Sequence, residues 1–178
     1  MKPEHMTELR AGEFVYKNHA LIRLRGALDS LEAELLLAQA ESAARGEAKA
    51  AADIGEALEY ARGLMRSEVL GEAVKPMRLF GMDADEIRDC SHYPKKYYNV
   101  GHFMPVSADD GILILKLNRL RTLAREAELC AVDAFMRDET AMSGAAGAVA
   151  TGADFIQAYN RLSSALYVMM IRAKAGVY

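Results

Sequence analysis

Residues 17–44 read KNHALIRLRGALDSLEAELLLAQAESAA, a stretch without proline that is rich in Leu, Ala and Glu. Apolar residues recur along it at steps of three and four, at Leu21, Leu24, Leu28, Leu31, Leu35 and Ala38. This spacing places them on one face of a helix. We therefore predict a long amphipathic helix from Lys17 to about Ala44, which Gly46 ends.

Three further segments have the same helical spacing and are predicted as long helices: Glu47 to Leu70, a segment that Asp109 or Asp110 caps and that ends near Glu139, and Asp154 to Lys174. The connection between the second and third is rich in proline and aromatics, and Asp83 can cap a short helix over Ala84–Cys90. The Gly/Ala stretch Ser143–Gly152 is predicted to be a flexible break. No strand pattern competes with these helices. The predicted fold class is all-α, an up-and-down bundle of four long helices with a short fifth helix in the connection.

Composition limits the kinds of partner. The chain has 178 residues, is 52% hydrophobic and has a formal net charge of −3, which predicts a single domain over 1–178 with an N-terminal arm over 1–15. There is no global basic field for nucleic acid. The longest apolar run, Leu162–Ile171, is about half the length that spans a bilayer. With two cysteines and a charged beginning, the chain is expected to be cytoplasmic, without nucleic-acid or membrane partners.

The string RTLAREAE, residues 121–128, places three charged side chains on nearly one face of the third long helix. Arg121 and Arg125 lie one turn apart, and Glu128 follows three residues later. Two neighbouring guanidinium groups can grip the oxygens of a polyphosphate, and Glu128 can orient Arg125. The alternative is a solvated stripe of ion pairs, which the spacing alone favours because such pairs are common on helices.

The string YNRLSSALYVMMI, residues 159–171, places a row of polar groups along an otherwise apolar helix: Asn160, Ser163, Ser164 and Tyr167. Polar groups in such surroundings need partners or a ligand. Asn160 can read the hydroxyls or ring nitrogens of a nucleotide, and Tyr167 offers a flat face with a polar tip. Internally satisfied contacts between helices are the alternative, and taken alone this is the favoured one.

These two strings resemble the two signatures of the ATP:cob(I)alamin adenosyltransferases. The resemblance extends to the ethanolamine-utilisation branch of that family through Arg25–Asp29, MRSEVLGE (65–72) and SHYPKKYYNVGHFMPV (91–106). In order and spacing it covers about Met6 to Ile171. It implies an enzyme that transfers the 5′-deoxyadenosyl group of ATP, with Mg²⁺, to cob(I)alamin and releases inorganic triphosphate. It also implies a homotrimer, with a reductase and an adenosylcobalamin-dependent enzyme as possible partners.

The resemblance assigns roles on the nucleotide side. Arg121 and Arg125 are expected to be catalytic, with Glu128 and Asn160 binding ATP. The propanediol-utilisation branch has an N-terminal phosphate loop and a second Arg directly after the one equivalent to Arg125, whereas this chain lacks the loop and has Glu126 at that second position. Other residues must therefore make the phosphate contacts that the loop and the second Arg make in that branch, and Lys17 and Arg25 are expected to supply them.

On the corrinoid side, GHFMP (101–105) takes the place of a segment whose aromatic side chain presses under the corrin and excludes the lower axial ligand of cobalt. Counting back from Pro105 assigns this role to His102, whereas residue type favours Phe103, which we prefer. Tyr167 is expected to lie near the corrin. The ethanolamine branch often has a preceding metal-binding Cys cluster. This chain begins where that region would end and has no Cys-x-x-Cys, so no metal site of that kind is expected.

Two other functions are compatible with these residues. One is a cobalamin carrier that delivers the finished coenzyme to a dependent enzyme. The other is a helical scaffold without a ligand. The combination of Arg121, Arg125 and Asn160 favours the use of ATP over both.

Overall fold

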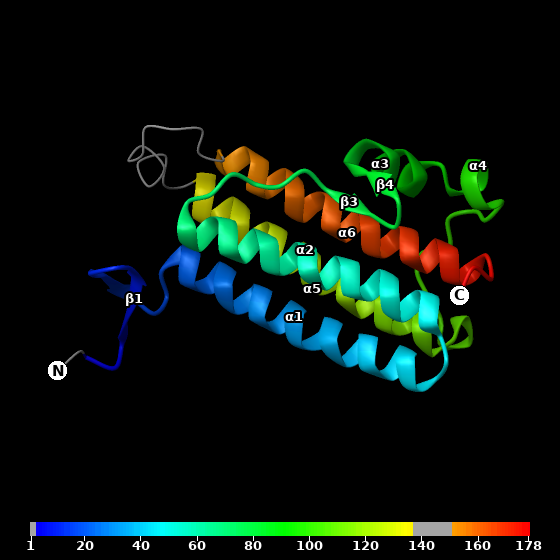
Figure 1. The fold of residues 1–178 in the computed structure, drawn as a ribbon, viewed down its shortest axis with the longest axis horizontal. Helices are drawn as coiled ribbons and strands as arrows, with labels where there is room; N and C mark the ends of the chain where they lie inside the picture. The colour runs from blue at the N-terminus through cyan, green and yellow to red at the C-terminus, as the bar shows by residue number, and fades with distance from the viewer. Residues whose placement is uncertain (1–2, 137–150) are drawn as a thin grey trace.

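Four long helices run side by side in the computed structural model, which describes residues 3–136 and 151–178 (Figure 1). They are α1 (Ala20–Ala44), α2 (Ala48–Leu70), α5 (Ile112–Met136) and α6 (Gly152–Lys174). α1 packs against α2 and α5, and α6 packs against α5 and α2. The all-α bundle class that the periodicity predicts is confirmed. In the part of the chain that the structure describes, no helix is both long and apolar enough to cross a membrane.

The connection between α2 and α5 returns along the bundle, so these two helices point in the same direction (Figure 1). The up-and-down alternation predicted for the long helices therefore does not hold between α2 and α5, because the connection is long enough to run back along the bundle. It contains β3 (Arg78–Leu79), β4 (Met82–Asp83), α3 (Ala84–His92), α4 (Pro94–Tyr98) and the 3₁₀ turn η1 (Ala108–Asp110). α3 is the predicted short helix, and the predicted cap is present: Asp83 Oδ1 accepts from Asp85 N and Glu86 N at 3.0 and 2.9 Å. α3 packs on α6 and thereby adds a wall beside the bundle.

The prediction that no strand competes was wrong near the N-terminus. β1 (Met6–Arg10) and β2 (Glu13–Tyr16) form an antiparallel hairpin. Gly12, with φ of +81°, adopts the left-handed conformation that its tight turn needs. The hairpin also shortens the first helix. α1 begins at Ala20 instead of Lys17 because His19 acts as its cap, with Nδ1 accepting from Leu21 N at 3.3 Å.

Two other helix boundaries differ from the prediction. Asp110 ends η1 instead of capping the long helix, and Gly111, with φ of +90°, separates η1 from α5. α6 begins at Gly152, two residues early, because Thr151 and Asp154 form a capping box. The predicted end of the third long helix near Glu139 and most of the predicted break at Ser143–Gly152 lie outside the described residues.

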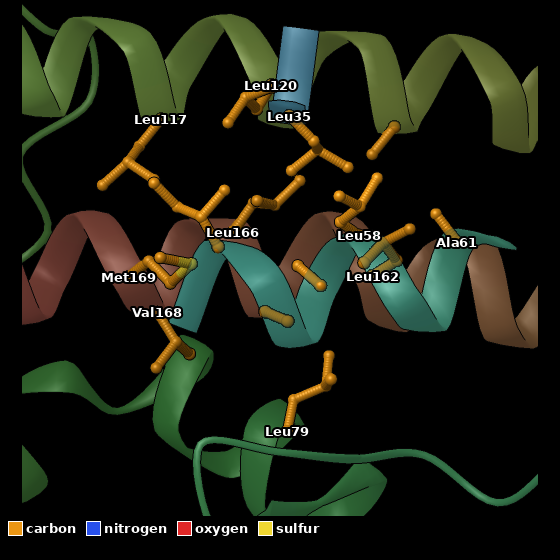
Figure 2. Close-up of a cluster of buried hydrophobic side chains, with 14 of the residues drawn as sticks. Leu35, Leu58, Ala61, Leu79, Leu117, Leu120, Leu162, Leu166, Val168 and Met169 are labelled. Carbon is orange, nitrogen blue, oxygen red and sulfur yellow. The ribbon is translucent and has the colours of Figure 1, made fainter. Parts of the chain in front are cut away.

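The core is built from the faces that the apolar spacing predicts. All six positions named on the first helix are buried. Figure 2 shows side chains from α5, α2 and α6 meeting in one layer, among them Leu117, Leu120, Leu58, Leu162 and Leu166. Val168 points from the other side of α6 toward the connection, where Leu79 lies. α6 is thus covered on several faces, and its polar side chains must meet partners or a pocket.

Candidate functional site

An open pocket of about 500 Å³ lies between α3, α5, α6 and the loop before η1. Its lining residues are Ser91, His92, His102, Met104, Arg121, Arg125, Ser163, Ser164 and Tyr167. Both predicted catalytic arginines and two of the three predicted corrinoid-binding residues therefore share one pocket. Their elements are held together because α6 packs against α5 on one side and against α3 on another.

The two arginines present positive charge to the pocket. Arg121 is half-buried, and its Nε and Nη2 donate to Asn118 Oδ1 at 3.1 and 2.9 Å. Burial, and then repulsion from Arg125, lower the pKa of Arg121 from its ordinary value. Arg125 is exposed, and neither arginine forms an ion pair within the described ranges 3–136 and 151–178. The stripe of ion pairs considered from the spacing is absent there, so both charges face the pocket uncompensated.

Glu128 does not contact Arg125 as the spacing suggested. Instead its Oε1 accepts from Asn160 Nδ2 at 2.8 Å, because α5 and α6 bring the two side chains together. Asn160 Oδ1 accepts from Arg161 Nη1 at 3.0 Å, which orients the amide. Asn160 lies one turn before Ser163 and Ser164, whose hydroxyls donate to its backbone carbonyl at 2.9 and 3.2 Å. These internal contacts match the alternative interpretation of the polar row, while both serines also line the pocket.

An aromatic wall forms the opposite side of the pocket. The rings of His102 and Tyr167 are nearly parallel, at 2°, with centroids 6.1 Å apart. His102 Nε2 lies 3.1 Å from the carbonyl oxygen of His92, which can only accept, so Nε2 carries the proton in the neutral ring. Nδ1 then accepts from the Tyr167 hydroxyl at 3.0 Å. Both ring nitrogens of His102 are therefore already engaged.

Phe103, the preferred candidate by residue type, does not line the pocket. Its ring lies 6.0 Å from that of Tyr167, packs against the main core and lies 5.8 Å from Lys174 Nζ. Burial raises the pKa of Tyr167, in keeping with its place between this cluster and the pocket. Of the two neighbours, His102 is the one at the pocket wall.

Lys17 and Arg25 are not brought to the pocket within the chain. Lys17 is exposed in the link between β2 and α1. α1 begins at the end of the bundle where α5 ends (Figure 1). Arg121 lies fifteen residues before Met136, about 22 Å along the helix axis from that end. Arg25 forms two hydrogen bonds to Glu68, at 2.7 and 3.1 Å, and a third to the carbonyl of Leu9 at 3.0 Å.

Four residues at the site were not predicted. Asn118 was detectable, because it lies one turn before Arg121 on a helix and an amide there can reach the guanidinium. Ser91, His92 and Met104 reach the pocket only because α3 and the following loop pack beside α6, which no local pattern reveals. Within the described residues no group of three or more His, Cys, Asp or Glu side chains is arranged to hold a metal ion.

Two curated relatives are 33% identical to the chain. The corrinoid adenosyltransferase EutT of Salmonella typhimurium aligns over 174 residues, which is 98% of this chain and 60% of the relative. That of Escherichia coli K12 aligns over 170 residues, which is 96% and 59%. The chain thus spans about three fifths of the length of these relatives.

No solved structure matches the chain. The family model described as cobalamin adenosyltransferase matches residues 1–173, nearly the whole chain, and so includes both the arginine pair and the aromatic wall. This chain belongs to the cobalamin adenosyltransferase family.

Proposed function

We propose that this chain transfers the 5′-deoxyadenosyl group of ATP to cob(I)alamin, giving adenosylcobalamin and inorganic triphosphate. The observation that carries the proposal is the pair Arg121 and Arg125, which face one pocket without a carboxylate partner among the described residues. Membership of the cobalamin adenosyltransferase family supports the same reaction. A helical scaffold would gain nothing from two uncompensated charges one turn apart.

In this reaction the electron pair of Co(I) forms the bond to C5′ of ATP, and the electrons of the C5′–O bond leave with the triphosphate. Cobalt is the nucleophile, so the protein needs neither a nucleophile nor a general base of its own. Its task is to align the two substrates and to stabilise the charge that grows on the leaving group. Arg121 and Arg125 are suited to that charge because guanidinium groups bind phosphate oxygens through paired donors.

Asn160 and Glu128 do not line the pocket, but they lie one turn from Ser163 and Arg125, which do, and the nucleoside would extend toward them. Asn160 has one free amide hydrogen beyond its bond to Glu128, and the second carboxylate oxygen of Glu128 can accept from a ribose hydroxyl. The pocket lining contains no carboxylate. A Mg²⁺ ion would therefore arrive on the nucleotide and be held by its phosphates, and this lining would not ligate it.

The corrin would lie against the aromatic wall. His102 and Tyr167 offer a flat surface, and both nitrogens of His102 are engaged with Tyr167 and His92, so the ring is not free to ligate cobalt. A wall that supplies no axial ligand favours four-coordinate cobalt, which accepts an electron more readily. Phe103 does not line the pocket, and its ring packs against that of Tyr167.

Lys17 and Arg25 would contribute to ATP binding only from a neighbouring copy, which requires the homotrimer. Exposed apolar side chains on α5 support such an assembly, since Leu129 and Met136 are 66% and 65% exposed. We place the enzyme in the cytoplasm, with a reductase and an adenosylcobalamin-dependent enzyme as partners. Light scattering that gives the mass of a monomer at working concentration would contradict the trimer.

An anaerobic assay with cob(I)alamin and MgATP tests the proposed reaction directly. Adenosylcobalamin formation, followed by absorbance, should match inorganic triphosphate release one to one. Calorimetry with ATP distinguishes the other functions. A carrier would bind adenosylcobalamin without turnover, and a scaffold would bind neither ligand.

Asn160→Ala is expected to raise the KM for ATP by about five- to tenfold with a smaller change in kcat, because one or two hydrogen bonds to the nucleoside would be lost. Steady-state kinetics at saturating cob(I)alamin measure both constants. Gln157→Ala is the matched control, since Gln157 is an exposed amide on the same helix, whereas it is Asn160 that bonds to Glu128. An unchanged KM would mean that Asn160 is structural.

His102→Ala is expected to reduce activity by about tenfold when the assay starts from cob(II)alamin and a mild reductant, and much less when cob(I)alamin is supplied ready-made. The reason is that loss of the wall admits a lower ligand to cobalt. His102→Phe should preserve much of the activity because it keeps a flat ring. Phe103→Ala is the paired variant. A selective loss with Phe103→Ala and none with His102→Ala would return the role to Phe103.

A further inference from the structure

Asn118 lies one turn before Arg121 on α5, and both side chains are half-buried. Its carbonyl oxygen accepts from Nε and Nη2 of Arg121 at 3.1 and 2.9 Å. Both donors belong to one edge of the guanidinium, so a single oxygen sets the plane of the group. Arginine has five N–H donors, and the three that remain are available for a ligand.

The acceptor is neutral, which matters at this place. A carboxylate at position 118 would offer the same geometry but would form an ion pair and cancel the charge of Arg121. The amide fixes the direction of the guanidinium and leaves its full positive charge. Arg125, one turn further along α5, repels Arg121. Without its bonds to Asn118, the flexible side chain of Arg121 would move away from Arg125, and its N–H donors would no longer point into the pocket.

We propose that Asn118 is a positioning residue for Arg121, holding the guanidinium at the pocket without neutralising it. This inference rests on the proposed function, in which triphosphate is the leaving group. The leaving group then meets a donor that is already oriented and fully charged, so less reorganisation is needed in the transition state. Asn118 itself does not line the pocket and is not expected to touch the substrate.

Two variants separate geometry from charge. Asn118→Ala removes the acceptor and keeps the charge of Arg121, so kcat with ready-made cob(I)alamin should fall about tenfold while the KM for MgATP changes little. Asn118→Asp keeps the shape and the acceptor but pairs with Arg121. Its affinity for inorganic triphosphate, measured by calorimetry, should fall about tenfold, with a weaker dependence on salt than in the wild type.

Arg119→Ala is the matched control, because Arg119 is exposed on the same helix and lines a different cavity. It should leave kcat and triphosphate affinity unchanged. Wild-type kcat in Asn118→Ala, or wild-type triphosphate affinity in Asn118→Asp, would overturn the proposal. It would also be overturned if the losses of kcat and of affinity were proportional to the drop in melting temperature of each variant. If the wild type itself shows no turnover, the proposed function fails, whereas the triphosphate affinities still decide whether Asn118 governs Arg121.

Discussion

Arg121→Ala and Arg125→Ala are each expected to lower kcat by roughly 100- to 1000-fold, the usual effect of removing one donor that stabilises developing charge. The reason is that both side chains reach the pocket, and neither fills the core. Folding should be preserved, because no ion pair is broken among the described residues and the repulsion between the two charges is relieved. Anaerobic turnover with cob(I)alamin and MgATP, together with the helical circular dichroism signal, measures both effects.

Two substitutions serve as controls for this prediction. Arg121→Lys keeps the charge but loses the planar fork and its bonds to Asn118, so it should recover only part of the activity. Arg119→Ala removes a charge from the same helix away from the pocket and should leave turnover unchanged. Wild-type turnover in Arg121→Ala or Arg125→Ala would refute the role of the pair and leave the proposed reaction without its main support.

Much of the fold was predictable because the long helices owe their burial to one regular feature, the three- and four-residue spacing of apolar side chains. Helix boundaries were less predictable because they depend on caps. His19 and Gly111 each moved a helix start by two or three residues. The N-terminal hairpin was missed because its strands are only five and four residues long, too short for alternation to stand out.

The site was predictable where its residues are neighbours on one helix. Arg121 and Arg125 share a face by their spacing alone, and the pocket contains both. Contacts between helices were not predictable in the same way. Glu128 was expected to orient Arg125 but instead meets Asn160, because the packing of α6 on α5 decides which side chain it reaches.

Arg25 shows how a resemblance in sequence can have a structural origin. Two of the segments shared with the ethanolamine-utilisation branch are Arg25–Asp29 and MRSEVLGE, and they meet in the ion pair between Arg25 and Glu68. The same guanidinium donates to Leu9 in β1, so it also ties the N-terminal hairpin to α1 and α2. The contacts of Arg25 with Glu68 and Leu9 are therefore explained by a structural role, and no ligand is needed to account for them.

Arg25→Ala is therefore expected to lower the free energy of unfolding by about 3 kcal/mol, because it leaves the carboxylate of Glu68 buried and unpaired. The Glu68 side chain is only 2% exposed, whereas that of Arg25 is 17% exposed, which places the expected loss at the low end for a buried pair. Urea denaturation at matched protein concentration measures the change. A loss below about 1 kcal/mol, the usual value of a surface pair, would contradict the structural role.

The double variant Arg25→Met with Glu68→Met separates this structural role from ATP binding. Replacing both partners by apolar side chains of similar length removes the unpaired charge, so most of the stability should return. If Arg25 only stabilises the fold, the double variant should have the wild-type KM for ATP as well as most of the wild-type stability. If Arg25 also reaches the nucleotide of a neighbouring copy, the double variant should be stable but keep a raised KM, because its positive charge is still missing. Lys17→Ala is the companion variant, since Lys17 is exposed and its removal should affect ATP binding without affecting stability.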